Sequence, residues 1–350
     1  MAPTADMTQS VYVGVDSGGT RTNVKIASED GNGIVPVDTY ETADSLSGAL
    51  PDGAVLDAMR AILAPLESRL EEDFHEPIAV YIWISAAGYT PWTRPIYVGA
   101  MRDLLSLILD GQIHKIGAAN DGISLLLGSG SDAVVIAGTG SNTLVRTRDG
   151  AIYQAGGHEW VACDYGSGFW IGLLGIRQAY VDFEAGQKTV LLQRLCEQFS
   201  VAVDDAASLI SHLRRFAVGD KDMKKDIARF APAVCAAAER GDRTAQNLVK
   251  KEAESLADVT ATALRRRLER NDFESGLQLL ECGSVVANPF YRTSFEGQVK
   301  LRLSDLEPEI QWTHVTTAED QCLHLARQLV ATGTEFERID AAFRPAIVEL

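Results

Sequence analysis

Two segments of this chain share an unusual design, in which a buried strand ends at small hydroxylated residues and glycines and then resumes as a second strand. The first contains Asp16-Ser-Gly-Gly-Thr20 after an apolar run, and the second contains Gly138-Thr-Gly-Ser141 after another. Glycine lets backbone N–H groups approach phosphate oxygens closely, and the hydroxyl groups add further donors. Two such loops can bind one polyphosphate, so they indicate a nucleotide such as ATP.

The length and charge of the chain limit its class. At 350 residues it exceeds what one hydrophobic core usually supports, and 46% hydrophobic residues suffice for two domains. The 48 acidic and 32 basic side chains give a net charge of -16. Such a charge repels nucleic acids and anionic membranes. We therefore expect two domains and a small-molecule partner.

The cysteines and the first residues bear on location. The 5 cysteines are odd in number, widely spaced and form no C-x-x-C pair, which argues against disulfides, a zinc site or an iron–sulfur cluster. Residues 1–10 lack the basic and apolar parts of a targeting signal, and the apolar run at residues 78–87 is too short to span a bilayer. We predict a cytoplasmic protein with neither a membrane nor a nucleic-acid partner.

Strand and helix patterns alternate along the chain, and the second half restarts the order of the first. In the first half, the patterns predict strands at residues 11–16, 22–28, 33–40, 78–85 and 113–118 and helices at 45–70 and 101–109. In the second half, they predict strands at 133–137, 143–147, 151–154, 277–282 and near 314–315, and helices at 122–127, 168–180, 290–303 and 318–331. Residues 190–270 are almost wholly helical in pattern. We predict domains at 1–118 and 119–350, with a helical insert at about 190–270 in the second.

Five short motifs, in a fixed order, carry a family resemblance. They are Asp16-Ser-Gly-Gly-Thr20, Asn120-Asp-Gly122, Gly138-Thr-Gly-Ser-Asn142, Asp164-x-Gly-Ser-Gly168 and Gly283-Ser284. Over residues 11–331 the chain resembles the N-acetylglucosamine kinase branch of the BadF/BadG/BcrA/BcrD ATPases, within the sugar kinase, Hsp70 and actin superfamily. The resemblance implies an α/β fold of two ribonuclease H-like (actin-like ATPase) domains with mixed five-stranded sheets. It also implies an ATP cleft between the domains that closes by a hinge motion.

The resemblance assigns roles in binding the cofactors ATP and Mg²⁺. Asp16 would hold Mg²⁺ through water. The phosphates would contact the first loop at Gly18, Gly19 and Thr20 and the second loop at Gly138, Thr139, Gly140 and Ser141, and the adenosine would contact Gly283 and Ser284. Each motif has a simpler structural interpretation: an Asx turn for Asp16, a hairpin turn for the second loop, and a strand-to-helix turn for the last motif.

Asp121 is the predicted catalytic base. It follows the end of a predicted strand and matches the family's base, which takes a proton from the sugar hydroxyl. An aspartate is ionised at pH 7, and phosphoryl transfer needs only modest proton acceptance. Asp121 could instead cap a helix that begins at Gly122, and the two roles are compatible.

The predicted contacts to the acceptor sugar are Asp44, Asn120, Asn142, His158, Glu159 and Asp164. Short amides and carboxylates suit sugar hydroxyls, which both donate and accept hydrogen bonds. The structural alternatives are a turn for Asn142, a helix-entry loop capped by Ser167 for the Asp164 motif, an ordinary loop residue for His158, and an N-cap for Asp44.

The chain departs from its family beside the predicted acceptor site. Relatives usually carry Gly-Gly-Trp-Gly and Gly-Asp-Glu-Gly-Ser, whereas this chain has Gly-Gly-His158-Glu159-Trp160 and Cys163-Asp-Tyr165-Gly-Ser167. A glutamate is absent and His158-Glu159 is new, so recognition of a 2-acetamido group is open. Relatives also tend to carry Gly-Ala on the last helix, where this chain has Ala318-Glu-Asp-Gln321, a change that the sequence leaves unexplained.

These observations predict an ATP-dependent kinase for the primary hydroxyl of an amino sugar such as N-acetylglucosamine or glucosamine. The resemblance also implies a homodimer. One alternative is an ATPase that activates a radical dehydratase, which would need cluster-binding cysteines that no pair here offers. Another is a non-catalytic sugar sensor, which would need a DNA-binding element where only about ten residues precede the first strand.

Overall fold

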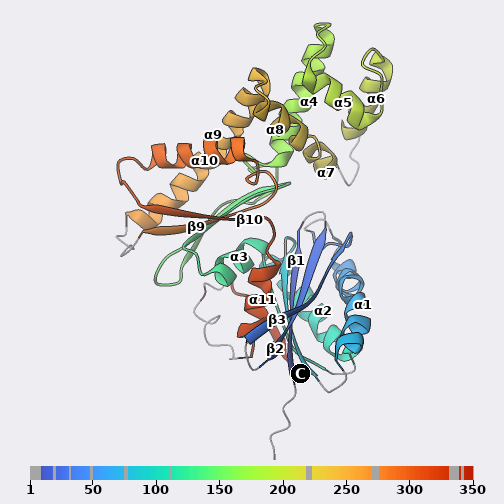
Figure 1. Ribbon diagram of the computed structural model, residues 1–350, viewed down its shortest axis with the longest axis vertical. Coiled ribbons are helices and arrows are strands. Elements are labelled where there is room, and N and C mark those ends of the chain that lie inside the picture. Colours follow the sequence, from blue (N-terminus) through green and yellow to red (C-terminus); the bar gives the residue numbers. More distant parts are fainter. Residues whose placement is uncertain are drawn as a thin grey trace, which may run out of the picture. The chain divides into compact units, whose positions relative to one another are not determined.

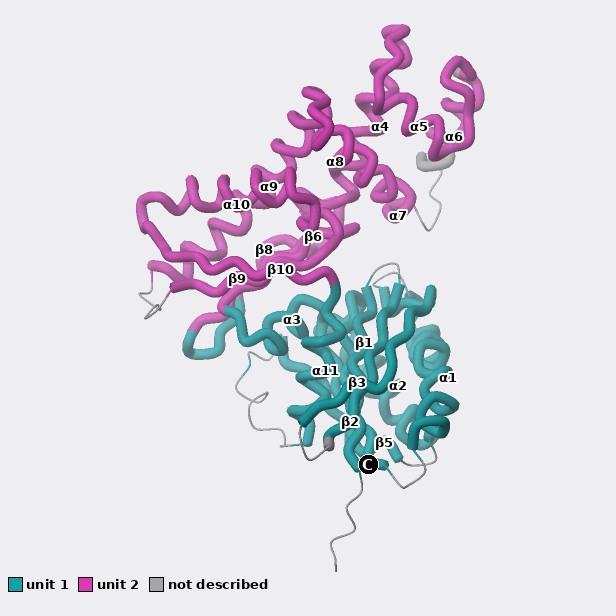
Figure 2. Tube along the Cα trace, in the orientation of Figure 1, with its two compact units in different colours: residues 1–131, 148–152, 317–350 teal, residues 132–147, 153–316 magenta. Residues whose placement is uncertain are grey.

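The computed structural model contains two compact units (Figure 2). Unit 1 consists of residues 1–131, 148–152 and 317–350, and unit 2 consists of residues 132–147 and 153–316. The boundary expected between residues 118 and 119 thus falls within unit 1, to which the C-terminal residues also belong. The structure describes residues 9–18, 21–30, 33–47, 50–74, 78–109, 112–217, 223–269, 276–330, 339 and 343–349.

The sheet of unit 1 has six strands in the order β11-β5-β4-β1-β2-β3. They are β1 (Gln9–Ser17), β2 (Thr22–Asp30), β3 (Gly33–Thr42), β4 (Ile78–Ala86), β5 (Ile113–Ala119) and β11 (Ala346–Glu349). β1, β4 and β5 run parallel, and the other three are antiparallel to their neighbours, so the sheet is mixed, as predicted. β11 makes six strands where five were expected. It has only 4 residues, too few for a clear alternating pattern, and its pairing with β5 defines it.

The side chains of β1 point alternately to the two faces of this sheet. The helices of unit 1 are α1 (Val55–Asp73), α2 (Arg94–Leu107), α3 (Asp121–Ser129) and α11 (Glu319–Gln328), with a short 3₁₀ helix, η1 (Asp52–Ala54), before α1. Val11, Val13 and Val15 are buried in a core shared with α1 and α2. Successive strand residues point to opposite faces, and α11 covers the other face (Figure 1). A Cβ at Gly14 would lie 2.5 Å from the backbone nitrogen of Leu323, so glycine lets α11 pack directly on β1.

Two of these helices begin elsewhere than the sequence predicted. α1 begins at Val55 rather than near residue 45, because Leu46 is buried in a loop, where its N–H donates to Oγ of Ser17 at 2.7 Å. α2 begins at Arg94 rather than at residue 101, with proline in its first turn, a position that proline favours.

The sheet of unit 2 has five strands in the order β10-β9-β6-β7-β8. They are β6 (Ala133–Ala137), β7 (Ser141–Arg146), β8 (Ile152–Gly156), β9 (Leu277–Cys282) and β10 (Ile310–Val315). β6 is antiparallel to β7 and parallel to β9, which is parallel to β10. This sheet is therefore mixed and five-stranded, as predicted.

Seven helices of the described chain belong to unit 2. They are α4 (Gly168–Glu184), α5 (Val190–Phe199), α6 (Ala206–Ala217), α7 (Met223–Ala228), α8 (Ala231–Glu239), α9 (Arg243–Leu268) and α10 (Pro289–Arg302). Val135 and Leu279 of the sheet share a core with Leu256 of α9 and Phe295 of α10. α5 to α9 occupy the region in which the sequence predicted a helical insert (Figure 1).

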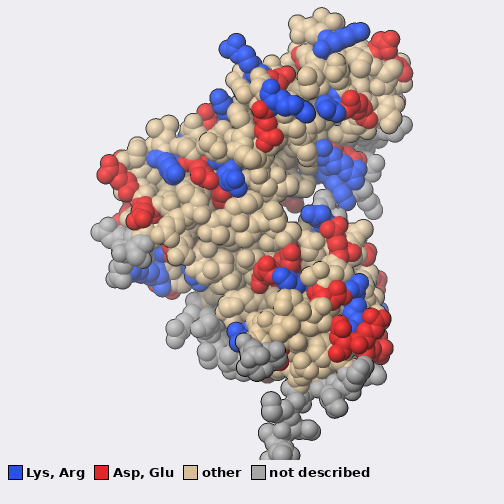
Figure 3. All heavy atoms as spheres, in the orientation of Figure 1, with Lys and Arg blue, Asp and Glu red and all other residues tan. Residues whose placement is uncertain are grey.

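The acidic surplus of the chain is visible on unit 1. Glu67, Glu71, Glu72 and Asp73 are exposed on α1, and Figure 3 shows acidic side chains gathered over this helix. Among the helices of the described ranges, none combines the length and the apolar character that a membrane crossing requires.

Candidate functional site

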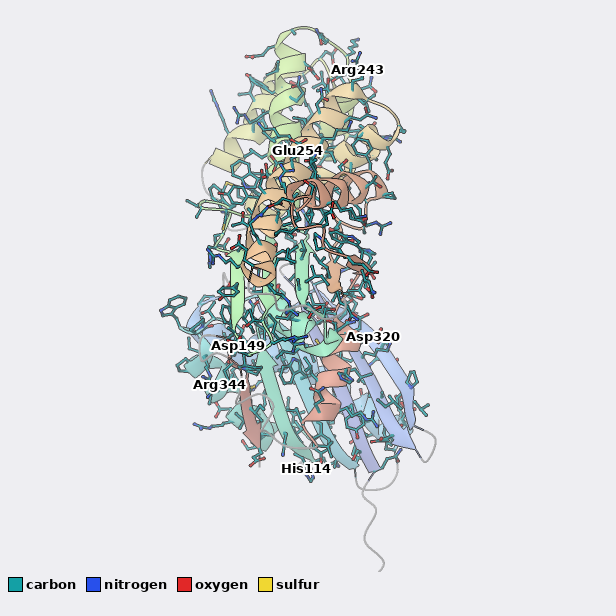
Figure 4. The ribbon with its side chains drawn as sticks, turned by 90° about the vertical axis from the view of Figure 1, so that its left-hand side faces the viewer. His114, Asp149, Arg243, Glu254, Asp320 and Arg344 are labelled. Carbon is teal, nitrogen blue, oxygen red and sulfur yellow. The ribbon has the colours of Figure 1, made fainter. Side chains whose placement is uncertain are left out.

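The carboxyl ends of the three parallel strands of unit 1 lie at one edge of its sheet. β1 ends just after Asp16, and Asp121 follows the end of β5. Figure 4 shows the two ends of this unit: His114 lies near the amino end of β5, and Asp320 near the start of α11 lies at the opposite end. In open α/β sheets, ligands bind outside the carboxyl ends of such strands. The predicted metal-binding and catalytic carboxylates therefore belong to one edge of unit 1.

The carboxylate of Asp16 is held by the segment before α11 and lies near other negative charges. Its Oδ2 accepts a hydrogen bond from the backbone N–H of Ala318 at 2.9 Å, which the alternative of a local Asx turn does not explain. Burial is the main cause that raises the pKa of Asp16 to about 6; the charges of Asp121 and Glu319 add to the rise, and the bond from Ala318 opposes it.

This surrounding fits a cation that Asp16 contacts through water. A positive ion favours the ionised carboxylate and would offset the repulsion from Asp121 and Glu319. Mg²⁺ prefers oxygen ligands, keeps several waters and often binds one or two carboxylates together with substrate phosphates. Within the described ranges, no group of three or more His, Cys, Asp or Glu side chains could hold a metal ion.

The start of α11 gives a structural role to residues that the sequence left unexplained. Ala318 supplies the N–H that binds Asp16, and Asp320 forms an ion pair with Lys25 of β2. The segment thus connects α11 to two strands of the sheet.

The first predicted phosphate loop is described in part. The N–H of Gly18 donates to the carbonyl of Arg21 at 3.1 Å, and Oγ of Ser17 lies 2.8 Å from Oγ1 of Thr22. These contacts join the end of β1 to the start of β2. Gly19 and Thr20, which were also predicted to bind phosphate, lie outside the described residues.

Asn120 and Asp121 share the start of α3. Asn120 is the N-cap: its Oδ1 accepts from the N–H of Gly122 at 3.1 Å, and its Nδ2 donates to the carbonyl of Tyr89 at 3.4 Å. The alternative of Asp121 as the N-cap is wrong, because Asp121 is the first residue of the helix. Its Oδ1 also accepts from Gly122, at 2.7 Å, and its side chain is partly exposed. The helix dipole stabilises a carboxylate there.

Asp44 lies in the loop after β3, in contact with the start of β2. Oγ1 of Thr22 donates to the carbonyl of Asp44 at 2.7 Å, and Oγ1 of Thr42 donates to its Oδ2 at 2.8 Å. The proposed N-cap role of Asp44 is wrong, since η1 and α1 begin several residues later.

The second predicted phosphate loop is the turn of the β6–β7 hairpin and is held by the start of α4. The N–H of Gly168 donates to the carbonyl of Gly138 at 2.7 Å, and the N–H of Phe169 donates to that of Thr139 at 3.2 Å. The hairpin alternative is therefore confirmed as the geometry of this loop, and α4 fixes its orientation.

The same loop is joined to the segment that contains Asp164. Oγ of Ser141 donates to the carbonyl of Tyr165 at 2.7 Å. A Cβ at Gly140 would lie 3.1 Å from Oδ2 of Asp164, so glycine allows the two segments to approach. Unit 2 thus places predicted phosphate-binding and acceptor-binding segments in direct contact.

Gly283 brings the predicted adenosine loop to the beginning of the second phosphate loop. Its φ is +116°, and a Cβ there would lie 2.5 Å from the carbonyl oxygen of Ala137. The N–H of Val285 donates to that same oxygen at 2.9 Å, and Ser284 is exposed. Only glycine tolerates both this conformation and this contact.

Asn142 provides a buried polar atom for which the described residues offer no hydrogen-bond partner. Its Oδ1 is buried and unpaired within that part of the chain. A Cβ at Gly157 would lie 2.7 Å from Cγ of Asn142, and Gly157 has a φ of +70°. Buried polar atoms are nearly always paired, so this atom is suited to receive a hydrogen bond from a ligand.

Asp164 and Glu159 are joined by Lys224, a residue that the sequence analysis did not single out. Nζ of Lys224 lies 2.8 Å from Oδ2 of Asp164 and 2.9 Å from Oε2 of Glu159. Asp164 is 3% exposed. Burial lowers the pKa of Lys224, but the bonds to Asp164 and Glu159 outweigh burial and raise it above its usual value. Lys224 is therefore charged and comes from α7, within the predicted helical insert.

The segment around this cluster has a constrained backbone. Glu159 and Asp164 have φ values of +71° and +61°, which non-glycine residues rarely adopt. Such conformations cost about 1–3 kcal/mol each and often occur at functional sites. Ser167 caps α4, as the structural alternative for this motif proposed, by accepting from the N–H of Trp170 at 3.4 Å. His158 is exposed, and its backbone N–H donates to Sγ of Cys163.

A comparison with protein families gives a match that covers most of the chain. The model of the BadF/BadG/BcrA/BcrD ATPase family matches residues 13–302. The chain belongs to this family. The match contains all five motifs on which the resemblance was based.

Two relatives of this family member have names that refer to sugar phosphorylation. An N-acetylmuramic acid/N-acetylglucosamine kinase of Clostridium acetobutylicum is 26% identical over 248 residues, which are 70% of this chain and 76% of the relative. An N-acetyl-D-glucosamine kinase of Dictyostelium discoideum is 24% identical over 273 residues, 74% of this chain and 81% of the relative.

Solved structures support the fold of this ATPase-family chain. A protein from Chromobacterium violaceum superposes with a TM-score of 0.66 at 20% identity, over 91% of this chain and 98% of its own. A ROK family glucokinase from Streptomyces griseus, in complex with glucose and AMPPNP, superposes with a TM-score of 0.57 at 17% identity, over 91% and 98%. At these identities the likeness concerns the fold alone.

Proposed function

We propose that this protein is an ATP-dependent sugar kinase that phosphorylates the primary hydroxyl of an amino sugar such as N-acetylglucosamine or glucosamine. Membership in an ATPase family supports the use of ATP. The two relatives named as N-acetylglucosamine kinases support the acceptor class. One observation carries the proposal: Asp16 and Asp121 lie at the ends of parallel strands of unit 1, and the charge of Asp121 contributes to the raised pKa of the buried Asp16.

Each group of residues has a task in this proposal. Asp16 binds the waters of Mg²⁺, and Gly18, Gly19 and Thr20 contact phosphate oxygens, as do Gly138, Thr139, Gly140 and Ser141 of unit 2. Gly283 and Ser284 contact the adenosine. Bound Mg-ATP supplies the phosphoryl group and the positive charge that stabilises its transfer.

Asp121 is the general base of the proposed reaction. Its carboxylate accepts the proton of the acceptor hydroxyl as the oxygen of that hydroxyl bonds to the γ-phosphorus atom. The bond from phosphorus to the bridging oxygen breaks, and ADP leaves. The hydrogen bond from the N–H of Gly122 to Oδ1 holds Asp121 in place.

Several polar side chains are proposed to contact the acceptor. Asn142 offers to a hydroxyl or amide donor its buried Oδ1, for which the described residues provide no partner. Asp164 and Glu159, joined by Lys224, offer both acceptors and a donor. Asp44, Asn120 and His158 are further proposed contacts. A cluster that can donate and accept suits a sugar, whose hydroxyls do both.

An assay of ADP release over a panel of acceptors tests this function. The panel contains hexoses, amino sugars, acetamido sugars, aminoglycosides and nucleosides, each with its analogue lacking the primary hydroxyl where one exists. We expect Mg²⁺-dependent turnover of amino or acetamido sugars and none of their 6-deoxy analogues. Failure of every sugar to stimulate ADP release, with ATP still bound, contradicts the proposal.

A further inference from the structure

Unit 2 contains a pocket that the proposed phosphoryl transfer does not use. It has a volume of about 470 Å³ and is bounded by α4, α6, α7 and the loop before α4. Its walls include Trp160, Leu173, Tyr180, Leu213 and Met223. Arg177, which is exposed, is the charged lining residue among those described. The pocket is therefore largely apolar and suits a hydrocarbon or aromatic group.

The pocket lies next to the polar cluster of the proposed acceptor site, because two of its lining residues are chain neighbours of that cluster. Trp160 follows Glu159 in the chain, and Met223 precedes Lys224, so the ion pair between Glu159 and Lys224 joins two walls of the pocket. Lys224 also contacts Asp164. A group attached to a sugar bound at this cluster therefore has the pocket as its neighbouring apolar surface.

The exposed surface around the pocket is also apolar at two positions. Val161, next to Trp160, is 77% exposed, and Val181, which lines the pocket from α4, is 55% exposed. Apolar surface of this kind, beside charged residues, is typical of binding sites.

The size of the pocket indicates more than an acetyl group. Pockets that bind organic ligands have volumes of roughly 300 to 1,000 Å³, and the observed volume lies in that range. An acetyl methyl fills a small fraction of such a space. A longer chain gains affinity by burying apolar area, by about fourfold for each methylene group.

We infer that the acceptor is a sugar bearing an acyl or alkyl substituent longer than acetyl, and that the pocket of Trp160, Leu173, Leu213 and Met223 binds that substituent. This inference rests on the proposed function. The polar cluster recognises the sugar, and the pocket selects for the length of the substituent.

A series of N-acyl glucosamines with acetyl, butanoyl and hexanoyl groups tests the inference by ADP release. For the wild-type protein, KM is expected to fall by about fourfold for each added methylene that the pocket buries. Leu173→Trp fills the pocket and is expected to remove this gain while N-acetylglucosamine is still phosphorylated. Leu301→Trp, at a 64% exposed position on α10, is the matched control and retains the gain. Equal KM values along the series, or a gain that survives in Leu173→Trp, overturn the inference.

A second variant and a binding measurement separate this inference from the proposed function. Leu213→Ala enlarges the pocket and is expected to shift the preference toward the longer acyl chain. This variant keeps the inference testable if Leu173→Trp does not fold. If no sugar is phosphorylated, the proposed function fails. Titration calorimetry with N-hexanoyl and N-acetyl glucosamine then still tests the pocket. The inference is supported if the hexanoyl compound binds more tightly and this preference is lost in Leu173→Trp or altered in Leu213→Ala. Equal binding of the two compounds contradicts it.

Discussion

Unit 1 and unit 2 each present an aspartate at a proposed ligand site, but the charges next to these two aspartates have opposite signs. Burial raises the pKa of Asp16 to about 6, and the negative charges of Asp121 and Glu319 add to the rise. Asp164 lies 2.8 Å from the ammonium group of Lys224. One site thus accumulates negative charge, whereas the other contains its own neutralising cation.

This difference in charge makes the two proposed sites suitable for different ligands. Repulsion between carboxylates stores free energy that a bound cation releases, so the edge of unit 1 suits Mg²⁺ with its phosphates. An internal ion pair already balances Asp164, so the cluster of unit 2 suits a neutral ligand that hydrogen-bonds to both charges. The comparison predicts opposite effects when each charge is removed.

The largest expected effect is on activity when Asp16 is replaced. Asp16→Asn keeps an oxygen that can accept from Ala318 but removes the charge that we propose to bind Mg²⁺. We expect kcat/KM to fall by roughly a hundredfold or more, because metal ions contribute several kcal/mol to transition-state stabilisation. ADP release at saturating sugar and varied Mg²⁺ measures this. Unchanged activity and Mg²⁺ dependence would remove Asp16 from the metal site.

The same variant is expected to be more stable than the wild type in the absence of Mg²⁺ and nucleotide. The pKa of Asp16 is about 6 in the folded protein and 3.8 as the reference value. Between these two pH values the folded state binds more protons than the unfolded state. The free energy of unfolding therefore falls as the pH rises, and the loss that Asp16 causes is constant above about pH 6. At pH 7, Asp16→Asn is expected to gain about 1–3 kcal/mol.

Urea denaturation at pH 4 and pH 7 measures this stability difference. The gain of Asp16→Asn over the wild type should be present at pH 7 and small at pH 4. Asp57→Asn, in the first turn of α1 and highly exposed, serves as the control and should show no such change. A variant that is less stable than the wild type at pH 7 would contradict the account of Asp16 as a carboxylate whose charge is disfavoured by burial and by its acidic neighbours.

A smaller effect, of the opposite sign for stability, is expected in unit 2. Lys224→Met leaves the buried Asp164 without this cation, so we expect lower stability and a KM for the acceptor raised by about tenfold, with kcat changed less. Lys300→Met, at an exposed position on α10, is the control. Should both variants behave alike in denaturation and in acceptor KM, Lys224 has no part in the acceptor site.

Local patterns predicted much of the fold. Apolar or alternating runs located the first five strands of unit 1, and the glycines that follow β6 and β9 marked the ends of those two strands. The late start of α1 was missed because it depends on a hydrogen bond between Leu46 and Ser17, which are far apart in sequence. β11 was missed because it is defined by pairing with β5, a strand that is far away in the sequence.

The residues of the candidate site could likewise be located only in part, because a sequence pattern reveals strand ends but not contacts between distant segments. The glycine-rich motifs and Asp121 occur at strand ends, which a sequence pattern can locate. Lys224 lies in a helix with no distinctive motif, and its contact with Asp164 exists only in three dimensions. The N–H of Ala318 is a backbone group and leaves no sequence signal at all.

The most direct test of the central claim, that Asp121 accepts the proton from a sugar hydroxyl at the edge of unit 1, is the turnover number of Asp121→Asn. Asparagine can still accept the hydrogen bond from Gly122, so the fold and ATP binding should be retained. We predict that kcat falls by roughly 10²–10⁴-fold while ATP affinity changes little, and that Asp57→Asn keeps wild-type activity. A folded Asp121→Asn protein with wild-type sugar-dependent ADP release would contradict the account.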